Sequence, residues 1–413
     1  MNHRDQIAAV NNSRALIDAE RRVESNTAGM AARYGGTLVF VANVAWFFLS
    51  HRLALAKAAM AAGFRVHLVS DIENEAEIIE AQKAGIDFHR LEMTRGGTNP
   101  LHDLKSLRTL KRIMKRLQPD IVHNVTAKPI FYGTQAARVS GARGVVNAIS
   151  GFGYAYSSDS RRLLRGLLNA AYERSFRPAN VRIIVQNAED RAAVLRLCPA
   201  AESRTRLIVG SGVDLTEFRV TPEPSGIPTV LLPGRLLREK GIYEFAAAAV
   251  ELRRSGLEAR FLLAGKLDPL NRGALTASQA QELCASSGLE WLGECKDMPR
   301  QMSHANIVCL PSYREGAPKA LVEACAAGRA VVTTDTAGCR EVVHAGKNGL
   351  LVPPRDATAL AAAIRRLIEN PDLRRRMGLA GRTRAESEFG IERVVQRHLE
   401  IYRELLAGAA AAT

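Results

Sequence analysis

From residue 37 onward the chain alternates short apolar runs with amphipathic stretches. Residues 37–43 form a run rich in β-branched and aromatic side chains, which predicts a buried strand. Residues 53–62 have apolar positions at helical spacing, and the pattern stops at Gly63. Residues 65–70 then predict a second strand, so the globular part begins with a strand–helix–strand unit.

The alternation continues on both sides of a stretch rich in proline and glycine at 219–228, which is typical of a connection between domains. Before it, the pattern predicts helices at 75–84, 104–117, 135–140 and 161–177 and strands at 120–124, 144–148 and 181–186. After it, strands are predicted at 229–232, 260–263, 290–292, 307–310 and 330–333, helices at 243–254, 279–286 and 319–327, and two terminal helices. Such alternation predicts parallel sheets with helices on both faces.

We therefore expect an α/β protein built from two Rossmann-like, doubly wound parallel-sheet domains that face each other across a cleft. Residues 1–34 are polar without a sustained apolar stripe and are expected to be a poorly ordered extension. The predicted domains cover 35–212 and 213–390, and the helix at 391–413 is expected to pack back on the first domain. Ligands of such sheets bind beyond the carboxyl ends of the strands, so the loops there should carry the chemistry.

Composition narrows the class of partner. The 413 residues carry a net charge of +15, which indicates an anionic partner such as a nucleotide, a phosphorylated substrate or a phospholipid surface. Aromatic residues are only 5%, and no basic run is interleaved with them, which argues against nucleic acid. The six cysteines form no Cys-x-x-Cys pair, so we expect no structural metal and a reducing cytoplasm. No apolar run is long enough to span a membrane or to form a secretory signal.

The segment that follows the apolar strand at 307–310 is the most informative. Glu315 lies in the predicted loop, Gly316 allows close backbone approach, and Pro318 suits the first turn of a helix. The free N–H groups of that helix favour an anion such as a diphosphate. Glu315 and Glu323 would accept hydrogen bonds from hydroxyls of the sugar and the ribose at either end. The alternative is that both carboxylates are merely solvated.

A second strand-to-helix loop lies at 232–241. Arg235 can contact phosphate bidentately, and Lys240 supplies a compact second charge. Together they would neutralise a departing diphosphate without a metal. The alternative is a solvated basic turn, because that spacing of arginine and lysine is common.

These segments resemble the retaining glycosyltransferases of family 4, bacterial enzymes of surface-glycan synthesis among them, whose fold is GT-B. The resemblance spans about residues 37 to 406. The motifs stand in the order of the family: segment 212–218, Arg235 and Lys240, Glu315 and Glu323, then segments 333–343 and 348–353.

The resemblance implies transfer from a nucleotide-activated sugar with retention at the anomeric carbon and without metal, cofactor or protein nucleophile. By resemblance, Arg235 and Lys240 hold the diphosphate, Glu315 contacts the donor sugar and Glu323 binds the ribose. The donor site further takes in the backbone of Gly316, Ala317 and Pro318.

In the first predicted domain, residues 43–52 resemble the acceptor-side loop of bacterial members of the family. His51 and Arg52 are candidates to contact the donor phosphate or an acceptor diphosphate. Many members have a Gly-Gly pair here, whereas Gly35 and Gly36 precede the strand in this chain, so those glycine roles do not carry over. The alternative for this segment is aromatic packing against the following helix.

The strand end at 120–129 resembles a family segment that has a His-x-His near the reacting carbon. This chain keeps the first histidine, His123, but has Val125 at the second position. The assisting role therefore stays open among His123, Thr126 and Lys128. A buried, hydrogen-bonded His123 is the alternative to a catalytic one.

Residues 161–177 combine leucines at helical spacing with flanking arginines, which is typical of a helix on an anionic membrane surface. The alternative is a helix packed on the sheet with its arginines in water. The preceding glycines and aromatics at 147–154 suit a loop over an acceptor.

The leading hypothesis is a glycosyltransferase that moves an N-acetylhexosamine or hexose from a UDP-sugar to a polyprenyl-diphosphate-linked saccharide. It would act in the cytoplasm, at most peripherally on the inner face of the membrane. The alternatives are a UDP-sugar 2-epimerase of the same architecture and a non-catalytic nucleotide-sugar-binding protein. A dehydrogenase is disfavoured, because no strand runs into Gly-x-Gly-x-x-Gly with an acidic residue about 20 positions on.

Overall fold

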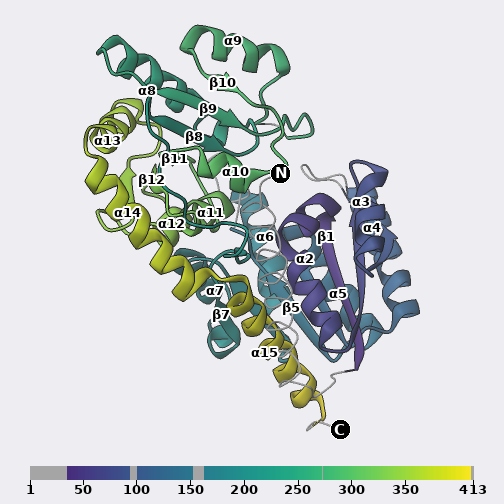
Figure 1. Cartoon of the computed structure of the whole chain (residues 1–413). Helices are drawn as coiled ribbons and strands as arrows, with labels where there is room; N and C mark the ends of the chain where they lie inside the picture. The colour runs from purple at the N-terminus through teal and green to yellow at the C-terminus, as the bar shows by residue number, and fades with distance from the viewer. Residues whose placement is uncertain (1–34, 94–99, 152–161, 272, 411–413) are drawn as a thin grey trace, which may run out of the picture.

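A computed structural model describes residues 35–93, 100–151, 162–271 and 273–410 of the chain. They form two parallel sheets, one of seven strands in the order β3-β2-β1-β4-β5-β6-β7 and one of six in the order β10-β9-β8-β11-β12-β13. Figure 1 shows the two sheets in separate bodies, each with helices packed around it. This architecture confirms the predicted pair of doubly wound α/β domains.

The first sheet consists of β1 (Gly36–Val44), β2 (Phe64–Asp71), β3 (Asp87–Arg90), β4 (Ile121–Val125), β5 (Gly144–Ala148), β6 (Val181–Val185) and β7 (Thr205–Leu207). Its helices are α2 (Ala45–Ala61), α3 (Glu75–Lys83), α4 (Pro100–Leu117), α5 (Ala127–Ser140), α6 (Arg162–Phe176) and α7 (Ala188–Leu197). Helix α5 begins eight residues before the predicted start at 135. The proline at 129 is compatible with this, because it stands in the first turn of the helix.

The second sheet consists of β8 (Thr229–Pro233), β9 (Arg260–Ala264), β10 (Glu290–Trp291), β11 (Ile307–Leu310), β12 (Ala330–Thr334) and β13 (Gly349–Val352). Its helices are α8 (Ile242–Arg254), α9 (Ala277–Ser287), α10 (Met298–Ser303), α11 (Lys319–Ala326), α12 (Ala337–Val342), α13 (Ala357–Glu369) and α14 (Pro371–Arg384).

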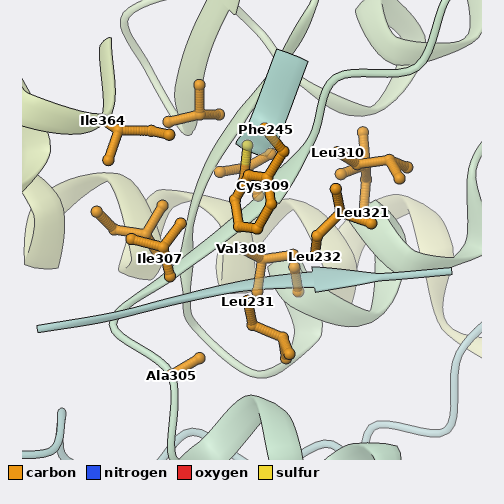
Figure 2. Packing of buried hydrophobic residues seen from close by; sticks show 14 of the residues in the cluster. Leu231, Leu232, Phe245, Ala305, Ile307, Val308, Cys309, Leu310, Leu321 and Ile364 are labelled. Atoms are coloured by element: carbon orange, nitrogen blue, oxygen red, sulfur yellow. The ribbon is translucent and has the colours of Figure 1, made fainter. Parts of the chain in front are cut away.

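Central strands of the second sheet are apolar along their whole length because helices cover both of their faces. Leu231 on β8 and Val308 and Leu310 on β11 are fully buried. Figure 2 shows these strand residues among the side chains of Phe245 from α8, Leu321 and Ile364. This continuous burial is the reason that a run of apolar residues, rather than an alternating pattern, predicted each strand.

The chain crosses back to the first sheet at its end. Helix α15 (Ile391–Ala410) follows α14 through the turn Ala385–Phe389, and the two helices run one after the other across both bodies in Figure 1. Glu404 of α15 pairs with Arg182 and Arg206 of the first sheet at 3.3 Å each. Tyr402 is fully buried in the first-domain core.

Val213 packs in the core of the second sheet, whereas Ile208 packs in the core of the first. On this packing we propose that the domains divide at 212/213, with the last helix returning to the first. The predicted extension at 1–34 lies outside the described residues.

Both sheets have a point at which the order of strands reverses. In the first sheet it lies between β1 and β4, and in the second between β8 and β11. The loops that leave such neighbouring strands diverge to opposite faces and open a crevice at their carboxyl ends. The predicted site segments lie on these loops in both domains.

Candidate active site

The loops after β8 and β11 lie against each other at the reversal point of the second sheet. Lys240 Nζ lies 2.5 Å from Glu315 Oε1, and both side chains are mostly buried. Gly241 makes this possible: it has a φ of 74°, and an added Cβ would lie 2.1 Å from the Pro311 carbonyl oxygen. No other residue fits there, and the arginine–lysine–glycine loop is thereby held beside Glu315.

A third loop supports Glu315 from behind. The N-terminal turn of α12 packs so closely on it that a Cβ at Gly338 would lie 2.4 Å from the Gly316 carbonyl oxygen and 2.5 Å from that of Glu315. The Thr334 hydroxyl, at the end of β12, donates to the carbonyl of Ser312. The segment at 333–343 therefore fixes the backbone that carries the carboxylate.

Glu323 lies one turn into α11, which begins after Pro318. Its carboxylate pairs with Lys319 and is almost fully buried. Burial raises the pKa of Glu323, Lys319 opposes that rise, and the nearby Glu217 adds to it. A buried carboxylate with one cationic partner has further lone pairs for hydroxyl donors.

Arg235 is held by groups that sequence reasoning did not assign to it. Its guanidinium lies 2.5 Å from the carboxylate of Asp268, which follows β9 and is 4% exposed. The guanidinium also lies over the indole ring of Trp46, 5.0 Å from the ring centroid, and Lys266 lies 5.4 Å from the same ring. Trp46 lies in the first turn of α2 in the first domain, so this cation–π contact joins the two domains.

The signal that would have found Asp268 is its position just after a strand end, beside the loop of Arg235. For Trp46 the sequence predicted a choice between an acceptor-side loop and aromatic packing. Its contact with Arg235 depends on how the two domains meet, which no local pattern encodes.

Further contacts join the domains beside the site. Asn187 donates to the Gly316 carbonyl at 3.0 Å, and a Cβ at Gly316 would lie 2.7 Å from Ser150 and from Gln186 Oε1. Glu341 accepts from the Ala188 N–H at 2.8 Å. The sequence predicted that Gly316 allows a ligand or backbone to approach closely. In this structure, Ser150 and Gln186 of the first domain make that close approach.

His51 lies in the cleft as a neutral imidazole. Its ring stacks on Phe47 with centroids 4.2 Å apart, and its Nδ1 lies 3.1 Å from the Phe47 carbonyl. Because a carbonyl only accepts, Nδ1 carries the proton and Nε2 keeps a free lone pair. Burial, together with the charges of Arg52, Lys319 and Arg235, lowers the pKa of His51 to about 3.

Arg52, which the sequence predicted as a candidate phosphate contact, lies in the interior of the protein. It is 3% exposed, and its NH1 donates to the His51 carbonyl at 3.1 Å. Burial lowers its pKa to about 10. It lies close enough to Tyr402 of α15 for their charges to interact.

His123 is fully buried, which favours the structural alternative over a catalytic role. Its Nδ1 lies 2.6 Å from the Tyr402 hydroxyl of α15, and its ring packs between Phe40 and His398. Burial lowers the pKa of His123 and keeps it neutral. The physical reason is the return of α15, which covers this strand from a position 279 residues away.

Lys128 and Thr126, the other two candidates of that segment, differ in their contacts. Lys128 pairs with Asp103 of α4 at 2.8 Å, with both side chains mostly buried. Thr126, by contrast, has a φ of 77° and a buried hydroxyl without a partner in the described part of the chain.

Helix α6 both packs on the first domain and leaves an apolar side chain in solvent. Tyr172 and Phe176 are buried, and Tyr172 meets Phe131 edge to face at 4.6 Å. Leu167 is 64% exposed. The helix borders a groove of about 740 Å³ whose lining includes Lys111, Arg138 and Arg174 and no acidic residue. The side chains of 161–164 lie outside the described residues, as do residues 152–154 of the loop predicted at 147–154.

In the second domain, Lys240 and Glu315 are therefore in contact, Arg235 follows the end of β8 in the same loop as Lys240, and Glu323 lies one turn into α11. Arg235 and Lys240 can bind a diphosphate, and Glu315 and Glu323 can accept from hydroxyls. Within the described ranges, no group of three histidine, cysteine or acidic side chains is arranged to hold a metal ion.

Two family models match the chain. The model described as glycosyl transferases group 1 matches residues 214–384, and the model described as glycosyl transferase 4-like matches residues 37–187. Each match covers most of one sheet and its site loops.

Two curated relatives match along more than four-fifths of their own length. A Campylobacter jejuni protein named N,N'-diacetylbacillosaminyl-diphospho-undecaprenol alpha-1,3-N-acetylgalactosaminyltransferase is 27% identical over 76% of this chain and 85% of its own. An Escherichia coli protein named UDP-Gal:alpha-D-GlcNAc-diphosphoundecaprenol alpha-1,3-galactosyltransferase is 24% identical over 74% of this chain and 81% of its own.

Solved structures share the fold. Sucrose-phosphate synthase from Thermosynechococcus elongatus superposes with a TM-score of 0.74 at 21% identity, covering 90% of this chain and all of that one. The Anabaena protein HepE, solved with UDP and glucose, superposes with a TM-score of 0.71 at 17% identity, covering 88% and 98%.

Proposed function

Because the chain belongs to the group 1 glycosyl transferases, we propose that it moves a sugar from a UDP-sugar to a polyprenyl-diphosphate-linked saccharide. The chain is a glycosyltransferase with the GT-B fold of its structural neighbours. We further propose that the transfer retains the configuration at the anomeric carbon and needs no metal. The observation that carries the proposal is the contact of Lys240 with Glu315, which sets a cation and a carboxylate side by side at one strand end.

Arg235 and Lys240 bind the donor diphosphate. Asp268 holds NH1 of Arg235, and no further hydrogen-bond partner of this guanidinium occurs among the described residues, which leaves its other edge for phosphate oxygens. A bidentate guanidinium and a compact ammonium together offset the charge that grows on the diphosphate as the sugar leaves. This is why we expect the reaction to proceed without a divalent cation.

The two carboxylates bind the donor sugar and the ribose. Glu315 stands beside Lys240, where it accepts from sugar hydroxyls, and Glu323 accepts from the ribose deeper along α11. The E. coli relative is named for UDP-galactose, which supports a uridine nucleotide here.

The acceptor class rests on the relatives. Both are named for saccharides on diphospho-undecaprenol, and the chain spans more than four-fifths of each. In the step itself, the acceptor oxygen bonds to the anomeric carbon on the face from which the diphosphate departs. The bond from that carbon to phosphate oxygen breaks, and the acceptor proton passes to that oxygen. This step needs no protein nucleophile.

A donor panel tests this function. Purified protein is mixed in EDTA with UDP-, GDP- and ADP-sugars and an extract that contains polyprenyl-linked saccharides. The mass of the product lipid is then measured by mass spectrometry. We expect one UDP-sugar to add one hexose or N-acetylhexosamine mass. Isomerisation of the donor without any acceptor would indicate the epimerase instead, and no product from any donor would contradict the proposal.

We also propose that the face of α6 contacts an anionic membrane surface, where such an acceptor lies. No helix in the described part of the chain is long and apolar enough to cross a bilayer. The exposed Leu167 and the groove cations Arg138 and Arg174 would instead give reversible binding.

Replacing Leu167 with aspartate and Arg174 with alanine is expected to lower affinity for phosphatidylglycerol vesicles at least about tenfold, since a basic residue near such a surface contributes about 1 kcal/mol and a leucine inserted into the membrane adds to it. Vesicle sedimentation measures this. Leu270→Asp is the matched control, because Leu270 is 68% exposed on the other domain. Equal sedimentation of both variants would exclude this face.

A further inference from the structure

Three neighbouring strands of the first sheet end in polar groups that have no hydrogen-bond partner. Asn43 Oδ1, Thr126 Oγ1 and Ser150 Oγ are buried and unpartnered among the described residues. A buried polar atom without a partner is costly, so such atoms call for a ligand or an ordered water.

The strand register places the three at one edge. Ala42 of β1 pairs with Val125 of β4, so Asn43 and Thr126 stand level, one step beyond. Val125 pairs in turn with Ala148 of β5, and the Thr126 N–H donates to the Ala148 carbonyl at 3.2 Å. Ser150 follows two residues later. Since neighbouring parallel strands lie about 5 Å apart, the outer two of the three groups stand on strands about 10 Å apart, a span that one small saccharide can bridge along this edge.

The backbone is irregular at this edge. Thr126 has a φ of 77° and a ψ of 170°, a region that is almost confined to glycine, and it is β-branched. The pairing of β1 with β2 shifts register between Val41 and Val44, where Asn43 lies. Strained residues and bulges persist where surrounding structure holds them and concentrate at functional sites.

This edge faces the donor carboxylate. An added Cβ at Gly316 would lie 2.7 Å from the Ser150 carbonyl, so Ser150 abuts the residue that follows Glu315. The edge also lies at the reversal point of the first sheet, opposite that of the second.

We propose that Asn43, Thr126 and Ser150 bind the hydroxyls of the acceptor sugar and aim the reacting one at the donor. The assignment rests on the proposed function and adds a site to it. All three groups are neutral, so they orient the acceptor hydroxyl by hydrogen bonds and leave its proton for the departing phosphate oxygen. Thr126 keeps a strained backbone at the strand end, where glycine would be relaxed, as expected of a residue that is held there for its side chain.

The test combines stability with acceptor kinetics. Thr126→Gly is expected to raise the melting temperature by a few degrees, because glycine adopts this φ and ψ without strain. The same change is expected to lower kcat/KM for the acceptor at least about tenfold and leave KM for the donor unchanged, since a hydrogen bond to substrate is lost. Thr126→Val should lose the same activity, and Thr126→Ser should keep it. Asn43→Ala and Ser150→Ala should each raise KM for the acceptor.

Gln118→Gly is the matched control. Gln118 has a φ of 46° at the end of α4, away from this edge, so glycine there should stabilise without changing acceptor kinetics. The assignment is overturned if Thr126→Gly lowers the melting temperature, or if Asn43→Ala, Ser150→Ala and Thr126→Val all keep the wild-type acceptor KM while transfer proceeds. A wild-type protein that transfers no sugar would contradict the proposed function, and this assignment would fall with it.

Discussion

Replacing Glu315 with glutamine is expected to lower transfer about a thousandfold while UDP still binds at least as tightly as to the wild type. The loss follows because the carboxylate is the group proposed to hold the donor sugar, and a charged hydrogen bond made at the reacting centre contributes about 3–4 kcal/mol. UDP binding should not fall, because Lys240 is paired with Glu315 at 2.5 Å and the substitution releases its charge for the diphosphate.

Two measurements separate these effects. Product lipid formed in single-turnover conditions reports transfer, and calorimetry reports UDP affinity. Glu258→Gln, an exposed carboxylate of the same domain, is the control and should match the wild type in both. Normal transfer by Glu315→Gln, or a joint loss of transfer and UDP binding, would contradict the role given to this residue.

Replacing Lys240 with methionine is expected to weaken UDP binding about a hundredfold, since a charge-assisted contact contributes about 1.5–3 kcal/mol. Two causes add up. The ammonium no longer meets the diphosphate, and Glu315 is left mostly buried without its cation, where it repels phosphate. Methionine keeps the length and packing of the side chain, so the loss reports charge.

A double-mutant cycle makes this prediction sharper. Lys240→Met combined with Glu315→Gln should bind UDP more tightly than Lys240→Met alone, because the stranded carboxylate is gone. Arg238→Met removes an exposed cation from the same short helix and should leave affinity within about twofold, as expected for a solvated charge. Additive effects of the two changes would show that Lys240 and Glu315 do not act as a pair.

Much of the fold follows from local pattern because the central strands are buried on both faces. Runs such as 229–232 and 307–310 are apolar along their whole length and stand between helical stretches. They could therefore be predicted as buried strands of a parallel sheet. The short strands β3, β7 and β13 were not predicted. They have only three or four residues, and β3 is largely exposed, so they carry little periodic signal.

The donor loops were predictable for a different reason. Arg235, Lys240 and Glu315 each follow a strand end, and parallel strands bring their carboxyl ends to one edge. Their positions after strand ends, which can be read from the sequence, therefore predict that these residues lie near the same edge of the sheet. Asp268 follows the end of the neighbouring strand β9, but its loop resembles no motif of the family. Its ion pair with Arg235 is visible only in the structure.

What failed to follow from sequence depends on contacts between distant segments. The sequence left a buried His123 open as an alternative but gave no sign that Arg52 is buried, and both lie in the interior close to Tyr402 of α15. Trp46 meets Arg235 only because the domains face each other. Patterns within a few turns of chain hold no information on such pairings.

A calorimetric titration of the purified protein with UDP in EDTA tests the central claim most directly, namely that Arg235 and Lys240 form a diphosphate site. We expect saturable binding of one nucleotide, lost or strongly weakened in Arg235→Ala and Lys240→Met and unchanged in Arg238→Met. Absence of binding to the wild type, or binding that survives both substitutions, would contradict the account.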